Sequence, residues 1–185
     1  MLLLVGLGNP HPDNKNNRHN IGFAVIDSIN KQYGLSKQKP KFKGLLTTGK
    51  IHDHKVFAVK PLTFMNNSGV CIKELVDYFK IDVGNVIVFH DDIDINLGKI
   101  RTKRGGSDAG HNGIESIDKY IGKEYTRVRI GIGISEEETV STHVLANFSE
   151  NEQSIITKIT KDIVSSLLIL MNKQLDLFSS KVNQT

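Results

Sequence analysis

The stretch LLLVGLGNP at residues 2–10 indicates the fold class of this chain. A short apolar run that stops at a Gly-Asn-Pro sequence is typical of a buried strand that ends in a loop. The run VIVF at residues 86–89 ends in the same way, in a loop that begins with His90. Between these strands lie segments with apolar residues at helical spacing, and strands that alternate with helices predict an α/β sandwich.

Hydrophobic periodicity places the remaining elements along the chain. Helices are expected over residues 21–33, from a cap at Asn66 or Ser68 to Phe79, over 114–121 and over 150–170, and further strands over 45–51, 56–59, 98–103 and 126–134. This order predicts a mostly parallel or mixed sheet, whose sites lie at the carboxyl ends of its strands. Ile155 is expected on the buried face of the last helix and Arg127 on the polar face of the last strand. Residues 135–147 are expected to form a loop, and residues 172–185 to fray.

Length and composition limit the class of protein to which the chain can belong. The chain has 185 residues, of which 38% are hydrophobic and 24% charged, which is typical of one globular domain and excludes collagen-like, mostly disordered and coiled-coil proteins. The longest apolar run, Met1–Val5, is far shorter than the roughly 20 residues of a membrane-spanning helix, and no basic segment of a signal peptide precedes it. We therefore expect a cytoplasmic protein with no membrane partner. The single cysteine, Cys71, excludes an internal disulfide.

The net charge of +4 is unevenly distributed along the sequence. Residues 31–60 contain eight lysines and one aspartate, a local charge of +7, and residues 99–104 add four basic residues and no acid. A basic face suits a phosphate backbone, because lysine and arginine release the counterions condensed on it. A lysine-rich face that is merely solvated has the same composition, so charge alone leaves both interpretations open.

The loop after the first strand contains Gly-x-Gly, but it does not match a dinucleotide-binding turn. The third glycine position holds His11, and the next helix begins about ten residues too late to present its amino terminus to a pyrophosphate. One interpretation of this loop is backbone geometry alone. The other is that Asn9 presents a carboxamide, which both donates and accepts hydrogen bonds, at the carboxyl end of a strand.

Two stretches carry ionisable groups suited to catalysis. His19, just before a helix, has the residue type to cap, pack, bind a metal or act as a base. The stretch HDDID at residues 90–94 follows a buried strand, and its carboxylates suit either Mg²⁺ or the orientation of a catalytic histidine. Spacing does not choose between these two roles for Asp91.

Two further stretches are Phe64–Gly69 and Gly105–Gly113. The first is typical of a helix cap preceded by an apolar residue. The second leads from a basic strand into a helix and is suited to hold an anion. It approaches the Gly-x-Ser-x-Gly elbow of serine hydrolases but lacks the last glycine, so Ser107 is not expected to be a nucleophile. The pair His52 and His54 is too sparse for a zinc site.

Five collinear stretches of the chain resemble the bacterial-type peptidyl-tRNA hydrolases. They are Gly6–Pro10, Arg18–Gly22, Thr63–Gly69, His90–Asp94, and Gly105–Gly113 followed by Arg129–Gly133. Together they span nearly the whole chain, and five matches in order are far more specific than one. The resemblance implies a single-domain, three-layer α/β/α protein over residues 1–185 that is a monomer and needs no cofactor or metal. It also implies cleavage of the ester between a peptide and the terminal ribose of tRNA, which recycles tRNA for translation.

The resemblance assigns roles to the matching residues. His19 resembles the general base that activates water, and Asp91 resembles the carboxylate that keeps this base receptive to a proton. Asn9 matches the residue that distinguishes N-blocked peptidyl-tRNA from free aminoacyl-tRNA. Asn66 and Asn112 match carboxamides that hold the peptide and the 3′ end of the tRNA, and a neutral amide pairs with any peptide group regardless of its sequence.

Other matches concern the surroundings of these residues. Phe64 and the backbone of Met65 are expected to line the same crevice. Three basic side chains are expected to grip tRNA phosphates, namely those of Arg101, Lys103 and Arg129. The expected partner is therefore tRNA that carries a peptide, and neither DNA nor a membrane.

The chain departs from the family pattern at two positions. His11 stands where the family has glycine after the Asn-Pro pair, and Asn14 stands where it has a tyrosine. If that tyrosine stacks on substrate, its loss costs about 1–3 kcal/mol of binding per base contact without removing catalysis. Residues 135–147 resemble the mobile lid of the family.

Two other functions are kept as alternatives. A non-hydrolytic RNA-binding relative would not need His19, Asp91 and the three asparagines. A magnesium-dependent phosphoesterase would use Asp91, Asp92 and Asp94, and it would lose its activity in a chelator.

Overall fold

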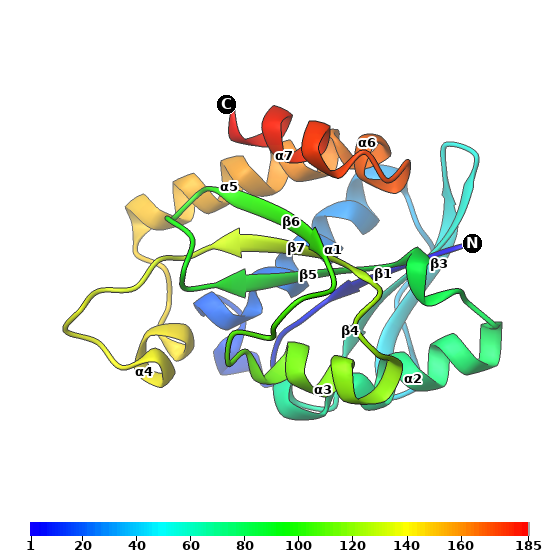
Figure 1. Cartoon of the computed structure of the whole chain (residues 1–185), viewed down its shortest axis with the longest axis horizontal. Helices are drawn as coiled ribbons and strands as arrows, with labels where there is room; N and C mark the ends of the chain where they lie inside the picture. The colour runs from blue at the N-terminus through cyan, green and yellow to red at the C-terminus, as the bar shows by residue number, and fades with distance from the viewer. Residues whose placement is uncertain (185) are drawn as a thin grey trace.

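The structure, a computed structural model, describes residues 1–184, which form one seven-stranded sheet between two layers of helices (Figure 1). The strands are β1 (Leu2–Gly6), β2 (Lys39–Lys41), β3 (Gly44–Ile51), β4 (His54–Pro61), β5 (Val86–Asp92), β6 (Ile100–Arg104) and β7 (Thr126–Gly131). The helices are α1 (Ile21–Tyr33), α2 (Ser68–Phe79), α3 (Asn112–Ile121), α4 (Val140–Leu145), α5 (Glu150–Ser165), α6 (Leu167–Met171) and α7 (Leu175–Asn183). Single turns of 3-10 helix are η1 (Pro12–Asn14), η2 (Arg18–Asn20), η3 (Met65–Asn67) and η4 (Val83–Asn85). The expected three-layer α/β/α arrangement is confirmed.

The sheet is mixed, with its parallel strands at the centre. Its order is β2-β3-β4-β1-β5-β7-β6. The neighbours β4–β1, β1–β5 and β5–β7 are parallel, whereas β2–β3, β3–β4 and β6–β7 are antiparallel. The carboxyl ends of the four parallel strands meet at one edge of the sheet, where a functional site is expected.

Alternate residues of β1 show why both faces of the sheet need a cover of helices. Leu2 and Leu4 belong to the core beneath α1, α5, α6 and α7, and Leu3 and Val5 belong to the core beneath α2 and α3. In Figure 1, α5, α6 and α7 lie above the sheet, and α2 and α3 lie below it. Within residues 1–184, none of the helices combines the length and the apolar character needed to cross a membrane.

Two glycines bring α1 against the ends of β1 and β5. A Cβ on Gly6 would lie 2.1 Å from the carbonyl oxygen of Gly22, and a Cβ on Gly22 would lie 2.4 Å from the backbone nitrogen of Leu7. Only glycine permits an approach this close. Because η2 directly precedes α1, the same contact places Arg18–Asn20 at the carboxyl edge of the sheet.

The last long helix differs from the expectation. It breaks at Ser166 into α5 and α6 instead of running over residues 150–170. Ile155, expected inside, is 44% exposed. The buried face follows Ile156 and Ile159, and a shift of one position turns a helical side chain by about 100°.

Residues 175–183 do not fray, contrary to the expectation for 172–185, because α7 packs against the edge strand β6. Phe178 is fully buried. The carboxamide of Asn183 accepts from the N–H of Ile100 and donates to its carbonyl, both at 2.9 Å. These bonds satisfy backbone groups that an edge strand otherwise leaves unpaired. Thr185 lies outside the described residues.

Two local expectations are also wrong. α2 begins after Asn67, whose side chain makes no cap bond, and the Ser68 hydroxyl instead donates to the Met65 carbonyl at 2.8 Å. Arg127 is buried rather than on a polar face, because its guanidinium is bound by Asp118 at 2.9 Å. In both places a contact with another turn or helix overrides the local pattern.

Candidate active site

A cavity of about 520 Å³ opens at the carboxyl ends of β1 and β5. Its walls come from the loop after β1, from η2 and η3, from the end of β5, from the start of α3 and from α4. It brings together seven residues that the sequence singles out, namely Asn9, His19, Phe64, Met65, Asn66, Asp91 and Asn112. In the cavity that residues 1–184 form, the lining does not include Arg101, Lys103 or Arg129.

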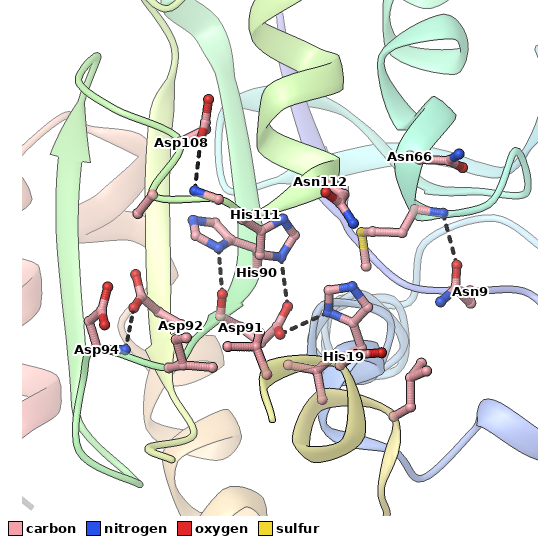
Figure 2. A pocket seen from close by; sticks show the side chains of 18 of the residues that line it. Asn9, His19, Asn66, His90, Asp91, Asp92, Asp94, Asp108, His111 and Asn112 are labelled. Carbon is pink, nitrogen blue, oxygen red and sulfur yellow. Dashed lines mark hydrogen bonds and ion pairs between the residues drawn. The ribbon is translucent and has the colours of Figure 1, made fainter. Parts of the chain in front are cut away.

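His19 and Asp91 form a buried pair in the cavity wall (Figure 2). Nδ1 of His19 lies 2.8 Å from Oδ2 of Asp91. Because an ionised carboxylate only accepts hydrogen bonds, this contact keeps the proton on Nδ1 and leaves a lone pair on Nε2. Nε2 has no hydrogen-bond partner among the described residues, and it lies on the side of the ring away from Asp91. His19 is thus arranged to take a proton from a molecule in the cavity.

The turn that carries His19 also orients Asn9. The carboxamide of Asn20 accepts from the Asn9 N–H and donates to the Asn9 carbonyl, both at 2.8 Å. The side-chain oxygen of Asn9 accepts from the Met65 N–H at 2.8 Å, which assigns the other side of the amide to nitrogen. This nitrogen has no partner within residues 1–184, so Asn9 offers two N–H donors to a ligand. The residues around Asn20 in the sequence do not reveal this role, because its partner, Asn9, lies on a different loop.

His111 binds the other oxygen of the same carboxylate. Its Nε2 lies 2.8 Å from Oδ1 of Asp91. Its Nδ1 accepts from the N–H groups of Gly113 and Ile114 at 3.1 and 3.3 Å, as the N-cap of α3. An imidazole whose Nδ1 accepts must carry its proton on Nε2, so His111 donates to Asp91. In the sequence His111 is one residue of the glycine-rich loop with no role predicted for it, although its position just before a helix is a signal for a cap.

The two histidines keep Asp91 ionised. Burial raises the pKa of this carboxyl group, but the opposing effect of His111 and His19 is larger and lowers the pKa well below its ordinary value. A third histidine, His90, packs its ring 4.9 Å from that of His111 and donates from Nδ1 to the Asp91 carbonyl at 2.8 Å. Burial and then the neighbouring His111 lower the pKa of His90 to about 3, so this ring is neutral near pH 7.

The residue types around Asp91 could hold a metal, but their bonding does not fit one. Ligand-type atoms of His19, Asp91 and His111 lie within 4.8 Å of one another. Because Nδ1 of His111 accepts from two backbone N–H groups, a metal on Nε2 would have to displace the only proton of that ring. Asp92 binds the Arg129 guanidinium at 2.8 Å, and this contact competes with a cation. The geometry favours Asp91 as the partner of a histidine.

The rim of the cavity carries groups without protein partners. Phe64 is 59% exposed, and its backbone, at φ 62° and ψ 160°, lies in a region that is unfavourable for any side chain. Such strain costs about 1–3 kcal/mol and persists where the surrounding structure holds it, often at binding sites. Asn66 and Asn112 are exposed, and their carboxamides have no partner within residues 1–184. These three side chains are available to a ligand.

Three basic residues lie beside the cavity. Arg101 on β6 is opposite Arg129 on β7. Lys103 is opposite the buried Arg127, two positions along the same strands, so the three basic residues and Arg127 share one face of the sheet. Burial, Arg129 and Arg127 lower the pKa of Lys103. The Arg129 guanidinium binds Asp92, which lines the cavity. We call Arg101, Lys103 and Arg129 the basic band; it joins the cavity at Asp92.

The loop expected over residues 135–147 contains the short helix α4. Four residues of this helix line the cavity, namely Val140, Ser141, Val144 and Leu145. Val140 and Leu145 are each 51% exposed, so α4 presents an apolar surface to whatever enters. The mobility of this segment stays a prediction.

The two departures from the family pattern and the serine of the glycine-rich loop lie outside the cavity lining. The His11 ring accepts from the Asp13 N–H at 3.2 Å, and Asn14 ends the same turn, η1. The Ser107 hydroxyl accepts from the Ala109 N–H at 3.0 Å and is exposed. None of these three side chains is placed to act on a molecule bound beside His19.

The family is shown by comparison with known proteins. The model of the family described as "Peptidyl-tRNA hydrolase" matches residues 3–185. The chain belongs to the peptidyl-tRNA hydrolase family. Its relatives include the peptidyl-tRNA hydrolase of Pelagibacter ubique, 65% identical over 99% of both chains. The peptidyl-tRNA hydrolase of Bartonella henselae is 41% identical over 100% of this chain and 96% of the relative.

A solved peptidyl-tRNA hydrolase has the same fold. The crystal structure of the protein from Acinetobacter baumannii is 36% identical, has a TM-score of 0.92, and the match covers 99% of this chain and 94% of that one. The resemblance noted in the sequence is therefore confirmed, and so is the α/β fold of the family. The roles of the individual site residues stay predictions.

Proposed function

We propose that the chain hydrolyses the ester between the peptide of peptidyl-tRNA and the 3′-terminal ribose, and that it releases free peptide and reusable tRNA. The observation that carries this proposal is the pair of His19 and Asp91, whose free Nε2 lies in a cavity with the Asn9 amide. Membership of the peptidyl-tRNA hydrolase family supports this ester as the substrate.

His19 acts as the base in this proposal. Its Nε2 takes a proton from water while the water oxygen attacks the ester carbonyl carbon. Ionised Asp91 stabilises the imidazolium through the Nδ1–H bond. The tetrahedral intermediate then expels the ribose oxygen, which takes the proton from Nε2. The peptide gains OH, the ribose gains H, and His19 returns to its neutral state.

Asn9 recognises carbonyl oxygens. Its amide hydrogens donate to the ester oxygen as negative charge develops there, and such donors are most effective where they are already oriented. They also suit the carbonyl of an N-blocking group, whereas the ammonium group of a free aminoacyl-tRNA offers donors only. Because the Met65 N–H holds the amide in one orientation, Asn9 supports selection of N-blocked esters.

The surrounding residues bind the two parts of the substrate. Asn66 and Asn112 offer free carboxamides to the peptide and to the 3′ end, and the Phe64 ring offers an exposed apolar surface. The basic band binds tRNA phosphates beside the cavity. All of these groups belong to one chain and none needs a cofactor, which supports a monomeric, metal-independent enzyme. Because tRNA serves translation, the proposed compartment is the cytoplasm.

The test is single-turnover release from an N-blocked aminoacyl-tRNA and from its unblocked counterpart, in EDTA, by wild type and His19→Ala. We expect cleavage of the blocked ester only, with a loss of about 10³- to 10⁴-fold in His19→Ala and retained tRNA binding. Wild-type protein that binds tRNA but cleaves neither ester would be an RNA-binding module. Activity that EDTA abolishes and Mg²⁺ restores would contradict the metal-independent mechanism.

A further inference from the structure

Arg18, the residue before His19, is buried and makes contacts that the proposed reaction does not use. Its backbone N–H donates to the Ala146 carbonyl at 3.0 Å. Its guanidinium donates from Nη1 to the His143 carbonyl at 3.1 Å and from Nη2 to Oε1 of Glu152 at 2.9 Å. One residue therefore ties η2 to the end of α4 and to the first turn of α5.

The partners of Arg18 are themselves held in place. Oε1 of Glu152 also accepts from the Ser149 N–H at 2.9 Å, within a capping box at the start of α5. Burial opposes ionisation of Glu152, but the Ser149 N–H and Arg18 lower its pKa below the ordinary value, so the ion pair is charged near pH 7. The Phe148 ring lies 5.6 Å from the guanidinium carbon. The contacts of Arg18 are thus a fixed junction and not a flexible surface pair.

The two segments joined at this junction form walls of the cavity. η2 carries His19, and α4 contributes Val144 and Leu145. An isolated antiparallel bridge between Asn17 and Asn147 lies in the same two segments. Any displacement of α4 relative to η2 would therefore displace the apolar wall relative to the base.

An arginine suits this junction better than a lysine does. Its planar fork reaches two acceptors on different elements at once, the His143 carbonyl and the Glu152 carboxylate. A lysine ammonium keeps the charge but is a single group on a flexible stem. Substitution by lysine would therefore keep the charge of the junction and lose its simultaneous reach to both acceptors.

We propose, on the basis of the proposed function, that Arg18 is a positioning residue for the general base. Arg18 holds His19 at a fixed position relative to Val144 and Leu145, the apolar wall of α4. An acyl group bound against this wall then presents its ester carbonyl to Nε2 of His19. A displacement of about 1 Å in such a geometry costs on the order of 10²-fold in rate. Arg18 acts through His19 and does not touch the substrate.

Arg18→Lys removes the fork and keeps the charge. For an N-blocked aminoacyl-tRNA we expect kcat to fall about 10- to 100-fold while KM stays within about twofold. Arg104→Lys is the matched control, because it makes the same change in an exposed arginine of β6, which pairs with Glu124 at 3.5 Å. We expect the Arg104→Lys protein to have wild-type activity. An unchanged kcat in folded Arg18→Lys protein overturns the proposal.

A double-mutant cycle separates positioning from a general loss of stability. Leu145→Ala shortens a half-exposed side chain of the apolar wall, and we expect it to lower kcat about 3- to 10-fold in wild type. In the Arg18→Lys background we expect little further loss, because the wall and the base are already uncoupled. Losses that simply multiply overturn the proposal.

If Arg18→Lys does not fold, Glu152→Ala replaces it in the same cycle, since it removes one of the two acceptors that orient the guanidinium fork and leaves Arg18 itself in place. Wild-type protein that cleaves no N-blocked ester contradicts the proposed function itself. Active wild-type protein with multiplicative losses contradicts only the role of Arg18.

Discussion

The turn η2 and the start of α3 each place a histidine against Asp91, and the two rings carry their proton on different nitrogens: His19 on Nδ1 and His111 on Nε2. Both contacts are 2.8 Å long. In η2 the Asn17 side chain caps the turn, so the His19 ring is not needed by the backbone. In α3 the His111 ring is itself the cap, and its second nitrogen is used by backbone N–H groups. The contact with Asp91 is the same in both, so the partner of the second nitrogen is what separates the proposed base, His19, from the capping histidine, His111.

The largest effect is expected where the second nitrogen is free. His19→Asn should lower single-turnover cleavage of an N-blocked aminoacyl-tRNA about 10³- to 10⁴-fold. The second nitrogen of His111 is used by backbone N–H groups, and Nε2 of His90, which has no hydrogen-bond partner among the described residues, is buried away from water. Binding of tRNA, measured by filter retention, should be unchanged. A loss as small as that of the matching change at His111 would contradict the difference proposed between the two histidines.

The Asn9 side chain resembles His19 in having one polar atom held by the protein and the other free. The Met65 N–H binds its oxygen, and its nitrogen is left for the substrate. Asn9→Asp keeps an oxygen for the Met65 N–H and replaces the free N–H donors by a charged acceptor. We expect kcat to fall about 10²- to 10³-fold, because a carboxylate repels the developing oxyanion. Asn9→Ala should lose less than Asn9→Asp, and the reverse order would contradict the donor role.

The matching change at His111 should have a smaller effect. Asparagine is a good N-cap residue, so His111→Asn preserves the start of α3 and removes only the bond to Asp91. We expect kcat to fall about 10-fold with little change in the free energy of unfolding, measured in urea. His111→Ala, which also removes the cap, should in addition lower stability by about 1 kcal/mol. Full activity of His111→Asn would show that Asp91 needs only one histidine.

The third histidine of the cluster extends the comparison to pH. The pKa of His90 is about 3 in the folded protein and near its ordinary 6.5 in the unfolded chain. Below pH 6.5 the unfolded chain therefore binds a proton that the folded protein does not, so stability falls as the pH falls. Between pH 6 and 5 we expect His90 to lower the folding equilibrium constant up to about tenfold, measured by urea denaturation. His90→Gln should lose this dependence, and equal pH slopes in the two proteins would contradict it.

The smallest effect is expected outside the cavity. Arg101→Ala and Lys103→Ala should each reduce the slope of log Kd against log salt by about 1, because each removes one phosphate contact. The rate of the bound complex in single turnover should stay within about twofold. Lys158→Ala on α5, where Lys158 pairs with Asp162 at 3.2 Å, is the control. Unchanged tRNA affinity in both variants would exclude the basic band from binding.

Local patterns predict those elements whose ends carry local signals. The helix expected over residues 21–33 is α1 as observed, since its apolar spacing stops at Gly34, which takes the left-handed conformation at φ 59°. The carboxyl-terminal segment, residues 172–185, carries no such local signal. α7 is held by bonds from Asn183 to Ile100 and by burial of Phe178, and these partners belong to other parts of the fold. No periodicity within residues 172–185 contains that information.

The α/β class, the strand ends that carry Asn9 and Asp91, and the family resemblance that the comparisons confirm all follow from the order of the residues. Which ring nitrogens of His19 and His111 are occupied, and what Asn20 and Arg18 contact, is visible only in the folded chain. Arg18 and Glu152 are 134 residues apart, and His111 and Asp91 are 20 apart. The physical reason is that a residue type sets which bonds a side chain is able to make, whereas a hydrogen bond forms only where folding brings donor and acceptor to about 3 Å.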